Sequence, residues 1–163
     1  MKPKPFRPEV RGKDARYCLD LETGLHWHRC RTRTLYADTD RSQVIYHANY
    51  LKYFEFGRAS LMRDVAYSYR EVEETGYVYP IVDLRIQFQQ PLYYDDPLWI
   101  HTRPAELERV RLRFDYFITH GETGDAICRG YTIHCCLNDR RIPVAVDPKT
   151  VQLWKNFPQP AAG

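Results

Sequence analysis

Three side chains that can do acid–base or nucleophilic chemistry lie near one another in the chain. Asp38, Asp40 and His47 all fall within LYADTDRSQVIYHANYLKYFEFGRAS, residues 35–60. A carboxylate can attack a carbonyl as a nucleophile or activate water as a general base, and an imidazole can orient water or protonate a leaving group. These residue types are therefore suited to general acid–base or nucleophilic catalysis.

The hydrophobic pattern predicts a strand before these residues and a helix after them. Residues 26–36 alternate in polarity with period two, with three arginines on one face. From about 47 to 64, apolar residues recur at three- and four-residue steps, which is typical of an amphipathic helix. The two aspartates then close the strand and the histidine begins the helix. Unpaired N–H groups and the helix dipole at such a start stabilise an anion.

The rest of the chain predicts a sheet wrapped around that helix. After residue 78 the period returns to two, and four further strands fall within 78–138, joined mostly by short turns. Gly57 lies on the apolar stripe of the helix, which indicates close approach of another backbone at that point. The expected fold is therefore α+β, with an antiparallel sheet covering one long helix.

Composition and boundaries predict one domain of a soluble, cytoplasmic protein. Residues 1–25, basic and proline-rich at their start, are expected to form a flexible extension, 26–157 the domain, and 158–163 a tail. The sequence has neither a run of ~18 apolar residues, as a membrane span requires, nor the apolar segment of a secretory signal.

The net charge argues against nucleic-acid binding, and the cysteine spacing argues against a zinc site. A net charge of +3 is too small to favour nucleic-acid binding. The five cysteines form no CxxC pair, and we expect reduced thiols rather than a zinc site.

The segment YADTDRSQVIYHANYLKYFEFGRAS, together with FQQPLYYDDPLWIHT and GYTIHCCLN, resembles the hotdog-fold acyl-CoA thioesterases of the 4-hydroxybenzoyl-CoA thioesterase type. It is most similar to the bacterial branch associated with the Tol–Pal system. The resemblance covers roughly residues 27–150. It implies a five-stranded antiparallel sheet around a long central helix, and a homodimer or a dimer-of-dimers tetramer with the active site where that helix meets the partner subunit.

The resemblance also implies catalytic roles. Asp40 corresponds to the catalytic carboxylate, and the backbone N–H of His47 to the oxyanion donor, with the His47 imidazole as a further participant. Asp38 is expected to be structural, bonding nearby backbone N–H groups. If the strand continued through both aspartates, they would share a face, and one would raise the pKa of the other. No metal or cofactor is expected, because coenzyme A is part of the substrate.

Other residues are expected to bind substrate rather than to react. Arg111 is the candidate for contacts with coenzyme A phosphates, although a solvated strand face is the simpler interpretation of its neighbourhood. Glu55 is a weaker candidate for a second carboxylate, and His134 is interpreted as a residue of the sheet. The remaining candidate substrate-binding residues are Gln43, Tyr46, Asn49 and Tyr50.

One residue departs from the family pattern and keeps a second function open. Gln43 stands where the family has a loop glycine, and a positive φ there would strain glutamine by ~1 kcal/mol. The main hypothesis is an acyl-CoA thioesterase, and the alternative is a non-hydrolytic acyl-CoA or acyl-thioester binding protein. An acyl-thioester dehydratase is disfavoured, because the Asp-x-Asp before YHANY is not its catalytic pattern.

Overall fold

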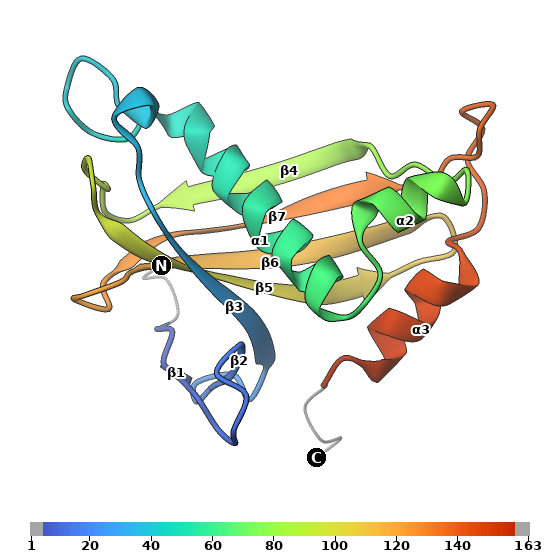
Figure 1. Ribbon diagram of the computed structural model, residues 1–163, viewed down its shortest axis with the longest axis horizontal. Coiled ribbons are helices and arrows are strands. Elements are labelled where there is room, and N and C mark those ends of the chain that lie inside the picture. The colour runs from blue at the N-terminus through green and yellow to red at the C-terminus, as the bar shows by residue number, and fades with distance from the viewer. Residues whose placement is uncertain (1–4, 159–163) are drawn as a thin grey trace.

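A seven-stranded antiparallel sheet carries a long helix across one face (Figure 1). The computed structural model describes residues 5–158. The strand order is β1-β2-β3-β5-β6-β7-β4. The strands are β1 (Pro8–Glu9), β2 (Tyr17–Asp20), β3 (His26–Arg33), β4 (Ile81–Phe88), β5 (Pro97–Leu107), β6 (Arg111–His120) and β7 (Ala126–Cys135). The helices are α1 (Tyr50–Asp64), α2 (Tyr69–Glu74) and α3 (Pro148–Asn156), with 3-10 turns η1 (Tyr36–Asp38) and η2 (His47–Asn49).

Helix α1 buries the predicted apolar stripe against the sheet. Phe54 and Leu61 are fully buried, and the Phe54 ring stacks on Tyr116 of β6 with centroids 4.2 Å apart. Burial of side chains of this size contributes about 1.5–3 kcal/mol each. The expected helix on an antiparallel sheet is confirmed, but the α-helix is shorter than expected, because it begins at Tyr50 and the preceding residues His47–Asn49 form the 3-10 turn η2.

Gly57 marks the closest approach of α1 to the sheet. A Cβ at this position would lie 2.5 Å from Thr102 Oγ1 and 2.6 Å from Ile100 Cγ2, both on β5. The close neighbours are therefore side chains of a strand, rather than the backbone that the sequence analysis expected.

The expected five-stranded sheet is wrong in strand number, because β1 and β2 extend it beyond β3. Although the sequence predicts a flexible N-terminal segment, Cys18 of β2 is buried beside Trp27 of β3. Short strands such as these depend on tertiary contacts more than on their own composition. Of the C-terminal tail, only residue 158 lies within the described part, and residues 159–163 lie outside it.

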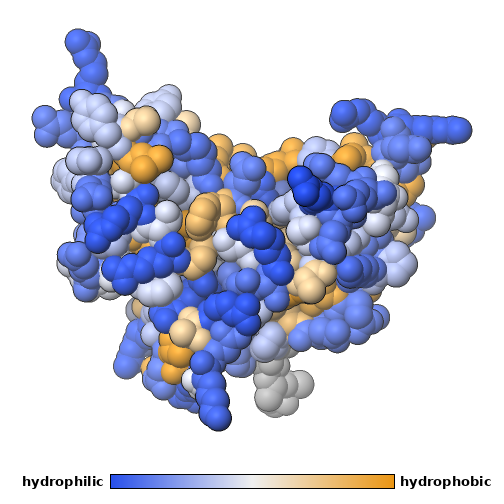
Figure 2. Space-filling view, in the orientation of Figure 1, coloured by the Kyte–Doolittle hydropathy of each residue, from blue (hydrophilic) through white to orange (hydrophobic). Residues whose placement is uncertain are grey.

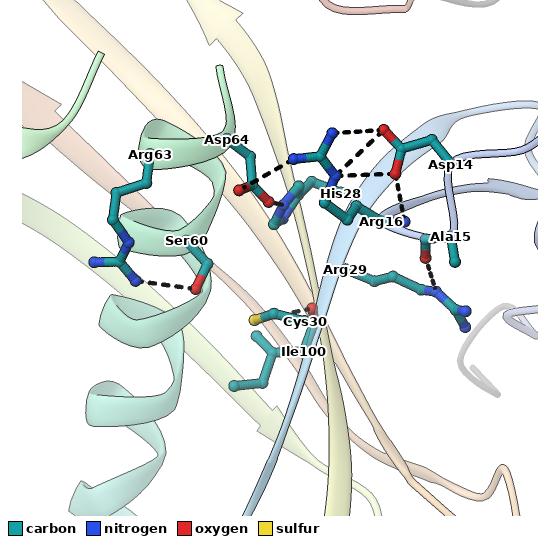
Figure 3. A network of polar contacts seen from close by, with 10 residues as sticks. All are labelled: Asp14, Ala15, Arg16, His28, Arg29, Cys30, Ser60, Arg63, Asp64 and Ile100. Carbon is teal, nitrogen blue, oxygen red and sulfur yellow. Dashed lines mark hydrogen bonds and ion pairs between the residues drawn. The ribbon is translucent and has the colours of Figure 1, made fainter. Parts of the chain in front are cut away.

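A charged network ties the N-terminal segment to the end of α1 (Figure 3). The His28 Nε2 lies 2.6 Å from Asp64 Oδ2, and the Arg16 guanidinium lies 3.4 Å from Asp64 Oδ1. Arg16 also pairs with Asp14 at 2.8 Å. Burial lowers the pKa of His28 despite its hydrogen bond to Asp64. The network therefore joins β3, the segment before β2 and the last turn of α1.

The opposite edge of the sheet is apolar and uncovered. Within residues 5–158, β7 is the single sheet neighbour of β4, and four apolar side chains of β4 are 40–51% exposed: Ile81, Val82, Leu84 and Phe88. Figure 2 shows apolar residues along the edge of the molecule over β4. Among residues 5–158, no helix is long and apolar enough to cross a membrane. All five cysteines are free thiols, as expected.

Candidate active site

The junction between β3 and α1 separates the two aspartates. Strand β3 ends at Arg33, and η1 turns the chain before Thr39. Asp38 is buried at 2% exposure, whereas Asp40 is exposed. The strand does not continue through both aspartates, so the condition for a shared strand face is not met, because a 3-10 turn interrupts the period of two.

Asp40 lies at the start of a tight loop that returns to η2. Its N–H donates to Val44 O at 2.9 Å, and its carbonyl accepts from Gln43 N at 3.0 Å. Its carboxylate Oδ1 accepts from Ser42 N at 2.7 Å, which forms an Asx turn. Gln43 has φ 65°, so the loop places a non-glycine residue in the left-handed region, which is the condition under which the sequence analysis expects strain at this position.

The start of η2 provides backbone donors. The Tyr46 N–H donates to Asp38 O at 2.9 Å, and the Asn49 N–H donates to Tyr46 O at 2.9 Å. Within residues 5–158, the N–H groups of His47 and Ala48 have no acceptor. Two adjacent free donors at a helix start can stabilise a developing oxyanion.

Asp40 and His47 line two different hollows on the surface of the described chain. The first has a volume of about 230 Å³ and is lined by Ile45, His47, Tyr50, Phe88, Gln89, Gln90 and Pro91. The second has a volume of about 450 Å³ and is lined by Tyr36, Thr39, Asp40, Arg41, Gln43, Tyr93 and Tyr94. The two hollows share no lining residue, so among residues 5–158 Asp40 and His47 face different hollows.

The other candidates at the junction have different surroundings. Tyr50 is buried, its hydroxyl accepts from Leu92 N at 3.3 Å, and it forms the wall of the first hollow. Tyr46 is 44% exposed, with its ring centroid 4.3 Å from that of His47. The Asn49 side-chain amide donates to Asp38 O at 2.8 Å, so it is already engaged within the loop.

The structure does not bring Arg111 to this junction. Arg111 lies opposite Cys135, and the adjacent His134 lies opposite Ile81 at the start of β4. The first hollow contacts Phe88 at the other end of that strand, which is ~23 Å away at ~3.3 Å per residue. Within one chain, the predicted phosphate contact is therefore remote from the catalytic candidates.

His134 lies in the sheet, in agreement with its sequence interpretation. Its Nε2 lies 2.8 Å from Thr132 Oγ1, and its Nδ1 lies 2.9 Å from Tyr79 O. Burial lowers the pKa of His134 to about 4. Glu55 is exposed on α1.

Sequence reasoning missed Lys52 and Tyr53, which both contact the Asp38 carboxylate. The available signal was a charged and a phenolic side chain in the first turn of a helix, shortly after a candidate buried acid. That signal is weak in the sequence alone, because the sequence does not say whether Asp38 or Asp40 is buried.

Comparisons with known proteins agree with this architecture. Residues 34–154 match the family model described as the thioesterase-like superfamily. The Bacillus subtilis protein YneP, whose name assigns it provisionally to the acyl-CoA thioesterases, is 28% identical over 134 residues, covering 82% of this chain and 92% of its own. A 1,4-dihydroxy-2-naphthoyl-CoA hydrolase of Thermosynechococcus vestitus is 29% identical over 132 residues, covering 78% and 88%.

Solved structures share the fold. A DHNA-CoA thioesterase from Staphylococcus aureus superposes with a TM-score of 0.72 and 26% identity, covering 80% of this chain and 93% of that one. About four fifths of this chain therefore share the architecture of that thioesterase.

Proposed function

The chain belongs to the thioesterase-like superfamily, and from this premise we propose that it hydrolyses an acyl-coenzyme A to a free carboxylic acid and coenzyme A. The observation that carries the proposal is the junction itself. An exposed carboxylate at Asp40 precedes a helix start whose first backbone donors are free. Thioester hydrolysis requires these two components, a nucleophile or base and a stabiliser of the oxyanion.

The proposed reaction assigns one role to each component. The Asp40 carboxylate either attacks the thioester carbonyl, to give an anhydride that water then cleaves, or removes a proton from the attacking water. The carbonyl oxygen becomes an oxyanion that accepts hydrogen bonds from the His47 N–H, with the Ala48 N–H beside it. Collapse of this oxyanion breaks the C–S bond, which forms the anhydride in the first route and the free acid in the second, and the coenzyme A thiolate takes up a proton from water or from the protonated Asp40.

Homodimerisation through β4 would complete the site. The edge strand exposes a row of apolar side chains, which is typical of an interface rather than of a free edge. Antiparallel pairing of two β4 strands sets the Ile81 end of one copy beside the Phe88 end of the other. The Arg111 end of the partner subunit would then approach the His47 hollow and could contact coenzyme A phosphates there.

The names of the relatives suggest an acyl group to test first. The Thermosynechococcus vestitus relative is named for 1,4-dihydroxy-2-naphthoyl-CoA and the Staphylococcus aureus structure for DHNA-CoA, so an aromatic acyl group is the first substrate to test. Tyr50 lines the His47 hollow and Tyr46 packs its ring against the His47 imidazole, so aromatic rings that suit such a group lie at this junction. Membership of the 4-hydroxybenzoyl-CoA type and of the Tol–Pal branch, and a cytoplasmic location, remain predictions from the sequence.

The test is thiol release from a panel of short, long and aromatic acyl-CoAs, with binding measured in parallel. Turnover of at least one class supports hydrolysis. Saturable binding of acyl-CoA without thiol release would instead establish the non-hydrolytic alternative.

A further inference from the structure

Asp38 joins the segment that carries Asp40 to the helix start that carries the free donors. Its carbonyl oxygen accepts hydrogen bonds from the Tyr46 N–H at 2.9 Å and the Asn49 Nδ2 at 2.8 Å. The Tyr46 N–H is thereby occupied, so the first unpaired backbone donor of the helix is that of His47. The main chain of Asp38 thus determines where the free donors begin.

The Asp38 carboxylate is fixed from the other side by α1. Its Oδ2 accepts from the Tyr53 hydroxyl at 2.9 Å and from the Leu35 N–H at 3.2 Å, and its Oδ1 pairs with the Lys52 ammonium. We call Asp38, Lys52 and Tyr53 the Asp38 cluster. Burial alone would raise the pKa of the Asp38 carboxyl, but these hydrogen bonds outweigh burial and hold its pKa below the usual value.

The charges in this cluster are unequal in exposure. The Asp38 side chain is 3% exposed, whereas the Lys52 side chain is 58% exposed. An ion pair with one partner in solvent adds little to the free energy of unfolding. It still fixes the direction of a buried carboxylate whose other oxygen is held by Tyr53, and so it fixes the loop to the first turn of the helix.

We propose that Asp38 is a positioning residue, and that its cluster sets the separation between the Asp40 carboxylate and the His47 and Ala48 N–H groups. The proposal rests on the proposed hydrolase function. Asp40 is separated from Asp38 by one residue of the chain. The His47 and Ala48 N–H groups are connected to Asp38 through the hydrogen bond from the Tyr46 N–H to the Asp38 carbonyl oxygen. A shift of ~1 Å between reacting groups can lower a rate by about 10²-fold, so loosening this connection acts on the chemical step.

The experiment compares kcat, KM and Tm of the full chain for variants of the cluster. Lys52→Met removes the ammonium while keeping the length of the side chain, and we expect kcat to fall about 10-fold with KM and Tm little changed. Tyr53→Phe removes only the hydroxyl and is expected to act in the same direction. Asp38→Asn should lower kcat by up to about 10²-fold.

Two controls separate positioning from general effects. Lys52→Arg keeps the charge and should recover most of the wild-type kcat. Lys155→Met removes an exposed charge from the last turn of α3 and should leave kcat unchanged. In a double-mutant cycle, Lys52→Met in the Asp38→Asn background should have a smaller effect than alone, because the two changes remove the same interaction.

Two outcomes would overturn different parts of the account. If the cluster variants lower Tm but retain the wild-type kcat, Asp38 contributes to folding only and the positioning role is refuted. If the wild-type protein releases no thiol from any acyl-CoA, the hydrolase function itself is refuted.

Discussion

Replacing His47 with proline separates the backbone donor from the imidazole at the same position. Proline has no N–H, so the variant deletes the first proposed oxyanion donor. The local backbone accommodates this residue: Tyr46 has φ −59° and ψ 133°, which is the region favoured before proline, and proline is common at the first position of a helix. His47 N–H has no acceptor among the described residues, so no internal hydrogen bond is lost.

The expected magnitude follows from the loss of one oxyanion donor. Removal of such a donor lowers kcat by about 10²–10³-fold, which corresponds to about 2.7–4 kcal/mol of transition-state stabilisation. The neighbouring Ala48 N–H is also free and can partly replace it, so the lower end of this range is expected. KM and Tm should change little, because the donor acts on the oxyanion rather than on the fold.

The assay is steady-state thiol release on the best substrate of the panel. His47→Ala is the matched control, because it removes the imidazole and retains the N–H. We expect His47→Pro to lose much more activity than His47→Ala. If the two variants had the same kcat while both remained folded, the backbone of His47 would have no part in stabilising the oxyanion.

Three further predictions concern the stability of the fold. Gln43→Gly should raise the free energy of unfolding by up to about 1 kcal/mol, because it removes a side chain from a residue with φ 65°. The stability of Gln43→Asn should lie between that of the wild type and that of Gln43→Gly. Equal chemical denaturation midpoints for the wild type and both variants would contradict strain at Gln43. Gly57→Ala should destabilise the protein by about 1–2 kcal/mol although alanine has the better helix propensity, because the added Cβ meets the side chains of Thr102 and Ile100. If chemical denaturation instead showed the variant to be more stable than the wild type, these β5 side chains would have moved to make room for the Cβ. Burial lowers the pKa of both His101 and His134 to about 4, below the value near 6.5 in the unfolded chain. The unfolded state therefore binds more protons than the folded state between these values. The free energy of unfolding should fall by up to about 3 kcal/mol per histidine as the pH drops from about 6.5 to 4. A His134→Gln variant should flatten that pH profile of Tm, and an unchanged slope would exclude His134 as its source.

The sequence predicts the regular part of this fold because its periodicity is strong there. The stripe from Tyr50 to Leu61 faces the sheet, and the alternation in β6 buries Leu112 and Phe114 as expected. These patterns reflect burial of one face, which is a local property of the sequence and needs no knowledge of distant contacts.

The elements that the sequence did not predict, η1, β1 and β2, depend on tertiary contacts. Nothing in the residues 34–38 distinguishes a continued strand from the 3-10 turn η1, because Leu35 and Tyr36 suit either. Strands β1 and β2 have two and four residues, in a segment whose charge and proline content favour disorder when read alone. They form because β3 offers them an edge, and the sequence does not reveal that edge.

The candidate site was predictable in type but not in arrangement. The motif placed a carboxylate before a helix start, and the positive φ of Gln43 agrees with the loop that the motif implies. Burial of Asp38, exposure of Asp40 and the contacts of Lys52 and Tyr53 depend on how the turn directs each side chain. Spacing along the chain does not determine that direction.

The most direct measurement is the kcat of Asp40→Asn on an acyl-CoA that the wild-type protein hydrolyses. The substitution preserves the shape of the side chain and removes its charge, so Tm should be unchanged. The account predicts a loss of kcat of at least about 10²-fold, in the range expected for removal of a general base and larger for a nucleophile. Wild-type turnover by a folded Asp40→Asn protein would show that this carboxylate does not carry out the reaction.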